Sequence, residues 1–168
     1  ALLGSLPMRR TLLASLGLLV VAPLLAAPPD WAAHYRERVA LFAQQNAALP
    51  AGKTHVVLVG DSLTEGWGAG EPNGRIAKYL GPIAGKVLNR GIASDGIGVN
   101  VRGVKRRLDE SVFDTRPERI VLLIGVNDVG RDGSGVAGCV RTYREVVRQL
   151  RSRLPEVPLH LVTTPPAR

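Results

Sequence analysis

The chain has 168 residues, 45% of them hydrophobic, which is enough for one domain with a buried core. The formal net charge is +8, but only 4% of the residues are aromatic, and basic and aromatic residues do not alternate as stacking on bases would require. We therefore expect no nucleic-acid partner, while weak attraction to anionic lipid or acidic glycans stays open. Basic residues on predicted helices are interpreted as solvated faces; they are Arg102, Lys105, Arg106, Arg107, Arg141, Arg144, Arg148, Arg151 and Arg153.

Residues 1–26 have the pattern of an export signal. A charged start at Met8–Arg10 precedes an apolar stretch over Thr11–Leu25, and small residues follow it. We expect cleavage after Ala26 and a secreted or periplasmic protein, with residues 1–7 lying upstream of the true start at the only methionine. Because the apolar stretch is short and contains a proline, we expect no stable membrane span once the signal is removed.

Residues 27–53 are predicted to form a helix and a linker. Asp30 is the expected N-cap of this helix. Large side chains recur at helical spacing from Trp31 to Phe42, which is typical of a helix that packs against a domain. A Leu-Pro-Ala-Gly sequence at 49–52 is expected to end the helix.

Residues 54–168 alternate between predicted strands and helices. The strands are Val56–Val59, Val87–Asn89, Ile120–Ile124 and Leu159–Thr163, and the helices run through Ile97–Leu108 and Val136–Leu154. Continuous apolar strands between helices are typical of an α/β protein with a parallel sheet covered on both faces. Ligands of such sheets bind at the C-terminal ends of the strands. The single cysteine, Cys139, falls on the apolar side of the second helix, where we expect a buried and inert thiol.

One serine, one glycine and one asparagine follow the first, second and third predicted strands, respectively. Ser62 lies in the Gly-Asp-Ser-Leu sequence Gly60–Leu63, Gly91 follows the second strand, and Asn127 follows the third. Because neighbouring parallel strands are about 4.8 Å apart, these positions could converge on one pocket. A serine hydroxyl beside main-chain N–H groups and an asparagine amide has the composition of a nucleophile with an oxyanion hole. Taken alone, Ser62–Glu65 also fits a capping box, in which the serine would cap the helix rather than react.

These segments resemble the first three motif blocks of the SGNH (GDSL) hydrolases, nearest the branch of platelet-activating-factor acetylhydrolase catalytic subunits and bacterial lysophospholipase-like esterases. The blocks read GDSLTEGW at 60–67, NRGI at 89–92 and GVND at 125–128. The resemblance, which covers about residues 54–168, implies a three-layer α/β/α sandwich with a parallel, flavodoxin-like sheet, hydrolysis of carboxylic esters, and no metal or organic cofactor. It also implies Ser62 as nucleophile, with the Ser62 N–H, the Gly91 N–H and the Asn127 amide as oxyanion donors.

The chain departs from this family in its histidines. The family carries a base histidine near its C-terminus, usually with an aspartate three residues earlier. Here His34, His55 and His160 have Trp31, Gly52 and Val157 at that distance. We interpret all three histidines as structural and expect the last strand and helix, with the acid and the base, to lie beyond residue 168. Residues 1–168 alone are then expected to be nearly inactive, because a serine hydroxyl is a poor nucleophile without a base.

Other functions remain open at this stage. An O-acyltransferase would use the same acyl-enzyme, and a non-catalytic acyl- or glycan-binding protein would use the same pocket; an Asp-x-x-His beyond residue 168 would favour catalysis. The ester could be a small molecule, a glycan or a lipid, and the pattern specifies neither acyl length nor oligomeric state. The GxGxxG sequence at Gly133–Gly138 does not follow its strand directly, which excludes a dinucleotide site. Asp95, Asp128 and Asp132 form no recognisable metal pattern.

Overall fold

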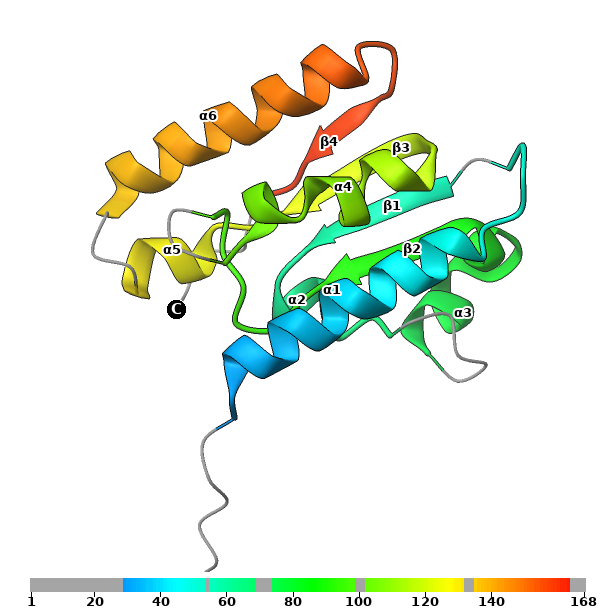
Figure 1. Cartoon of the computed structure of the whole chain (residues 1–168), viewed down its shortest axis with the longest axis horizontal. Helices are drawn as coiled ribbons and strands as arrows, with labels where there is room; N and C mark the ends of the chain where they lie inside the picture. Colours follow the sequence, from blue (N-terminus) through cyan, green and yellow to red (C-terminus); the bar gives the residue numbers. More distant parts are fainter. Residues whose placement is uncertain (1–28, 54, 69–73, 99–101, 132–134, 164–168) are drawn as a thin grey trace, which may run out of the picture.

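Figure 1 shows the computed structural model of the chain, which describes residues 29–53, 55–68, 74–98, 102–131 and 135–163. The predicted export signal lies outside these residues, as does the start of the Gly133–Gly138 segment. Within the described ranges, each helix is too short or too polar to cross a membrane.

The described residues form a four-stranded parallel sheet in the order β2-β1-β3-β4. The strands are β1 (His55–Gly60), β2 (Val87–Gly91), β3 (Pro117–Leu123) and β4 (Leu159–Leu161). The α-helices are α1 (Trp31–Ala47), α2 (Ser62–Glu65), α3 (Arg75–Leu80), α4 (Leu108–Ser111), α5 (Val126–Arg131) and α6 (Gly135–Arg153), and the 3-10 helices are η1 (Gly81–Lys86), η2 (Val104–Arg106) and η3 (Phe113–Thr115). The predicted α/β class and parallel sheet are confirmed, and each predicted strand lies at or near its expected place.

Helices lie on both faces of this sheet (Figure 1). Val57 pairs in register with Leu88 and Ile120, so these side chains share one face, where the main core packs against α4 and α6. Helix α1 lies on the same side and contacts α4. Leu58 and Asn89 point to the opposite face, which α2 covers. The result is the expected three-layer arrangement. Cys139 lies in the core, as predicted.

Helix α1 begins as the sequence predicts. The Asp30 carboxylate accepts hydrogen bonds from the N–H groups of Ala32 at 3.0 Å and Ala33 at 2.9 Å, which makes it the N-cap. Its predicted packing stripe holds only in part, because Phe42 is fully buried whereas Trp31 is 38% exposed.

The predicted helix over Ile97–Leu108 is wrong. The structure has a bend at Ile97 and Gly98, then the 3-10 helix η2, and α4 begins only at Leu108. Gly103 has φ of +126°, which an L-residue in a helix cannot adopt, and a Cβ there would stand 2.2 Å from the Gly98 Cα. The apolar spacing therefore reflects burial of separate turns rather than one helical face.

Arg107 is also contrary to expectation, since it is not part of a solvated face but fully buried. Its guanidinium makes an ion pair with the buried Asp95 carboxylate, with Nε to Oδ2 at 2.9 Å. It also donates to the main-chain oxygens of Arg90 at 2.8 Å and Gly60 at 3.1 Å, and to the Ser111 hydroxyl at 2.8 Å. One side chain thereby joins the C-terminal ends of β1 and β2 to the loop that follows β2.

Replacing Arg107 with alanine should lower the free energy of unfolding by about 3–5 kcal/mol, because Asp95 would stay buried without its partner. The neighbouring Arg106 is exposed, so Arg106→Ala should change it by less than about 0.5 kcal/mol. Urea denaturation followed by circular dichroism measures both values. Similar losses in the two variants would contradict the role given to the buried pair.

Candidate functional site

Ser62 is exposed and is the first residue of α2, directly after β1 and one intervening aspartate. That aspartate, Asp61, is the N-cap: its Oδ1 accepts the Leu63 N–H at 2.9 Å, and its main-chain oxygen accepts the N–H groups of Thr64 and Glu65. The capping role considered for Ser62 is therefore wrong. In the part of the chain that the structure describes, neither the Ser62 N–H nor its hydroxyl has a hydrogen-bond partner, so both can meet a ligand.

Asp61 itself is fully buried beneath this serine. Its Oδ2 has no hydrogen-bond partner among the described residues. Burial raises the pKa of Asp61 above its ordinary value, and the hydrogen bond from the Leu63 N–H opposes that shift without cancelling it. The turn that presents Ser62 therefore contains a carboxyl group whose charged form is disfavoured.

Gly91, the second predicted site residue, is buried at the end of β2. Its N–H donates to the Asn89 side-chain oxygen at 2.9 Å. A Cβ at this position would stand 2.2 Å from the Glu65 nitrogen, so the glycine lets the last turn of α2 lie directly on β2. The structure thus gives Gly91 a packing role. Its N–H could serve as an oxyanion donor only after Asn89 released it, and that role stays a prediction.

Asn127, the third predicted site residue, is the second residue of α5. Its Nδ2 donates to the Asp95 main-chain oxygen at 2.8 Å, which ties the loop after β3 to the loop after β2. A carboxamide nitrogen carries two hydrogens, so one remains for a ligand. Because Gly60 pairs with both Gly91 and Leu123, the three strands end level, and all three predicted residues lie at the same edge of the sheet.

The loop after β2 contributes residues that the sequence analysis missed. The Ala93 N–H donates to the Glu65 carboxylate, and Ser94 has φ of +62°, a left-handed conformation that is uncommon for serine. Burial raises the pKa of Asp95, although the Arg107 guanidinium acts in the opposite direction. Spacing within the sequence gives no signal for these contacts, because each joins residues from separate elements.

Each of the three histidines bonds to a group other than Ser62. His34 in α1 donates from Nε2 to Glu65 Oε2 at 3.1 Å. His55, the first residue of β1, bonds through Nδ1 to the Thr115 main-chain oxygen at 3.2 Å, and His160 in β4 accepts from Arg119 at 2.7 Å. Within the described ranges, no three His, Cys, Asp or Glu side chains gather as a metal ion would require.

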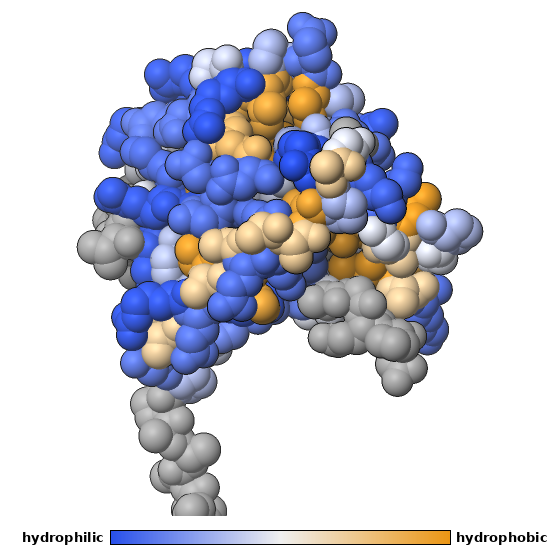
Figure 2. All heavy atoms as spheres, turned by 45° about the vertical axis from the view of Figure 1, so that its right-hand side comes forward, coloured by the Kyte–Doolittle hydropathy of each residue, from blue (hydrophilic) through white to orange (hydrophobic). Residues whose placement is uncertain are grey.

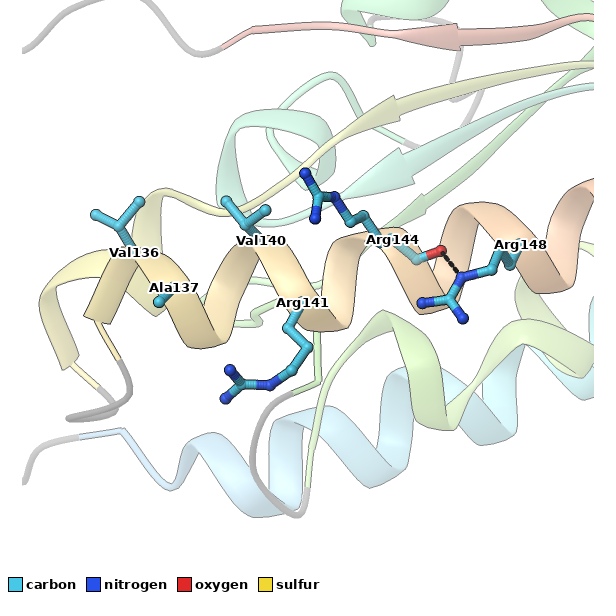
Figure 3. Close-up of a pocket in the computed structure, with 6 residues that line it drawn as sticks. All are labelled: Val136, Ala137, Val140, Arg141, Arg144 and Arg148. Carbon is cyan, nitrogen blue, oxygen red and sulfur yellow. Dashed lines mark hydrogen bonds between the residues drawn. The ribbon is translucent and has the colours of Figure 1, made fainter.

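Figure 2 shows hydrophobic residues exposed among mostly hydrophilic ones on one face of the molecule. The hollows among the described residues include one beside α2 and one along α6. A hollow of about 250 Å³ with an apolar lining lies beside α2 and includes Leu63 and Trp67. A larger one, of about 590 Å³, lies along α6 (Figure 3). There Arg141 and Arg144 extend in different directions, and Arg148 bonds back to the Arg144 main-chain oxygen at 3.3 Å. These arginines fit the predicted solvated face and do not surround a common point.

The buried carboxyl of Asp61 leads to a pH-dependent prediction for the variant Asp61→Asn, which keeps a side-chain oxygen for the cap. The folded-state pKa of Asp61 is raised above the unfolded value of 3.8, so the stability it contributes is complete below that pH and is lost as pH rises through the folded-state pKa. Asp61→Asn should therefore gain stability relative to the native protein as the pH rises. Urea denaturation from pH 4 to 7 measures the difference in free energy of unfolding between Asp61→Asn and the native protein. The variant Asp114→Asn, at an exposed position, is the control. A stability advantage of Asp61→Asn that shrinks towards neutral pH would refute the raised pKa of Asp61.

The sequence profile described as the GDSL-like lipase/acylhydrolase family matches residues 58–168, more than half of the chain. No curated protein matches the chain.

Among solved structures, a Bacteroides fragilis protein assigned as an acylhydrolase is 26% identical with a TM-score of 0.57, and covers 83% of this chain and 61% of its own. A Streptococcus pneumonia protein assigned as a platelet activating factor is 19% identical, with a TM-score of 0.63, covering 78% of this chain and 55% of its own. A GDSL-like lipase from Bacteroides thetaiotaomicron is 21% identical, with a TM-score of 0.54, covering 73% of this chain and 56% of its own. The latter two show the fold alone, and this chain spans 55% to 61% of the length of the three structures. On the family profile and the matching fold, the chain belongs to the GDSL-like lipase/acylhydrolase family.

Proposed function

We propose that this chain is part of an exported serine esterase that hydrolyses carboxylic esters with Ser62 as its nucleophile. The observation that carries the proposal is the position of Ser62. It is exposed at the start of α2, and Asp61 performs the capping that would otherwise occupy its hydroxyl. Membership of a lipase and acylhydrolase family supports ester chemistry. The exported location rests on the sequence pattern of residues 1–26.

In the proposed reaction, the Ser62 oxygen attacks the ester carbonyl carbon, and the serine proton passes to a general base. The tetrahedral intermediate collapses as the alcohol leaves with that proton. Water, activated by the same base, then attacks the acyl-enzyme and releases the carboxylic acid and the free serine.

The negative charge on the carbonyl oxygen would be stabilised by two donors at the sheet edge. These are the Ser62 N–H, which belongs to the first turn of α2, and the second hydrogen of the Asn127 amide. Gly91 would contribute a third donor only if its N–H left Asn89 when substrate binds.

The general base is proposed to be a histidine outside residues 1–168. The support for this is that each histidine in the chain bonds to a group other than Ser62: a carboxylate for His34, a main-chain oxygen for His55, and a guanidinium for His160. The solved structures that match the chain are also longer than it.

Labelling of the intact gene product with a fluorophosphonate probe tests the nucleophile. The label should map to the peptide that contains Ser62, and Ser62→Ala should remove it. Ser152→Ala changes an exposed serine on α6 and should leave labelling unchanged. A label on any other peptide would rule out Ser62 as the nucleophile.

The proposed location of the base leads to a second prediction. Residues 1–168 alone should hydrolyse p-nitrophenyl acetate barely above the background rate, because loss of the base in triad enzymes lowers turnover on the order of 10⁶-fold. Initial rates of release of p-nitrophenol, compared with Ser62→Ala, measure this. Robust turnover that Ser62→Ala abolishes would show that a base lies within these residues.

A further inference from the structure

We propose that Glu65, held by His34 and Arg38 of α1, is a positioning residue that fixes the loop Ala93–Asp95 and, through it, the Asn127 amide. The inference rests on the proposed esterase function. It makes α1, which precedes the residues matched by the family profile, a part of the active site.

The Glu65 carboxylate is where three elements meet. It lies at the end of α2, three residues after Ser62, and its Oε2 accepts from the Ala93 N–H in the loop after β2. The same oxygen accepts from His34 Nε2 at 3.1 Å, while Oε1 lies 3.4 Å from Arg38 Nε. In the capping box considered above, this glutamate would turn back to the start of its own helix, but here it faces a different loop and a different helix.

The contacts are shielded enough to fix the carboxylate. The side chain of Glu65 is 22% exposed and that of Arg38 is 17% exposed, so the ion pair is screened less than one in open solvent. Arg38 also donates through Nη2 to the Gly91 main-chain oxygen at 3.2 Å, and its guanidinium lies 5.0 Å from the centre of the Phe42 ring. Arg38 therefore connects α1 both to Glu65 and to the end of β2.

From Ala93 the chain of contacts continues to the proposed oxyanion donor. Ser94 adopts its left-handed conformation between Ala93, which bonds to Glu65, and Asp95, which bonds to Arg107. The main-chain oxygen of Asp95 accepts from Asn127 Nδ2 at 2.8 Å and so sets the direction of its second hydrogen. Release of Ala93 would remove the bond between this loop and α2, so that the loop is held mainly by the Ile92 N–H on the Gly60 oxygen and by Asp95 on Arg107. The Asn127 amide would then be oriented less firmly.

The test uses four variants of the intact protein: Glu65→Ala, Glu65→Gln, Arg38→Ala and the control Arg36→Ala, an exposed arginine on the same helix. Two quantities are measured: hydrogen exchange of the Ala93 amide, and the acylation of Ser62 by p-nitrophenyl acetate per active site. Glu65→Ala should raise exchange at Ala93 by about tenfold or more. It should slow acylation on the order of 10- to 100-fold with little change in KM, since a displaced donor acts on the transition state.

Glu65→Gln should restore most of both quantities, because its side-chain oxygen can still accept the Ala93 N–H. Arg38→Ala should shift both in the same direction as Glu65→Ala, and Arg36→Ala should shift neither. If Glu65 served only the stability of the fold, Glu65→Ala would lower the fraction of active sites that can be acylated but not the acylation rate per active site. Glu65→Gln would then not rescue that rate selectively.

Unchanged exchange at Ala93 in Glu65→Ala would overturn the proposal, as would acylation that stays at the native rate while exchange rises. Failure of the proposed function looks different: the intact protein would then show no acylation at Ser62, or the same acylation in Ser62→Ala. In that case exchange at Ala93 still shows whether Glu65 holds the loop.

Discussion

The buried pair of Arg107 and Asp95 is the interaction on which the C-terminal edge of the sheet depends. Strands β1 and β2 end at this edge, where the Gly60 oxygen accepts from the Ile92 N–H and also from Arg107. The Arg107 guanidinium donates to the Arg90 oxygen as well, and its five donors in a fixed plane suit several acceptors at once. Because Asp95 also accepts from Asn127 through its main chain, the same pair fixes the loop beside the proposed nucleophile.

The Arg107 guanidinium can be buried because several hydrogen-bond acceptors and one aromatic ring surround it. The guanidinium groups of Arg38, Arg90 and Arg107 lie 5.0, 4.7 and 5.9 Å from the centre of the Phe42 ring. Burial, and to a smaller extent the neighbouring charges of Arg38 and Arg107, lowers the pKa of Arg90 to about 10. Gln45 and Asn46 accept from Arg90, so α1 contacts the domain through polar side chains as well as through the buried Phe42.

The sequence predicts those parts of this structure that depend on neighbours along the chain. The parallel strands follow from short apolar runs, and this prediction is confirmed. Arg107 was misread because its partners lie 12 residues away at Asp95 and 47 away at Gly60, and a charge count cannot show this. Glu65 was missed for the same reason, since its partners His34 and Ala93 are 31 and 28 residues away.

The close approach of α2 to the sheet explains, on packing grounds alone, why glycine occupies two motif positions. A Cβ at Gly60 would stand 2.0 Å from the Thr64 hydroxyl oxygen, and one at Gly91 would stand 2.2 Å from the Glu65 nitrogen. These two glycines pair in register, so together they form a surface without side chains on which α2 packs closely. Asn89 then secures the end of α2 by donating to the Thr64 and Gly68 main-chain oxygens. The position of the serine at the start of this helix is therefore a consequence of packing beneath its last turn, and a motif glycine cannot be assigned to catalysis by its presence alone.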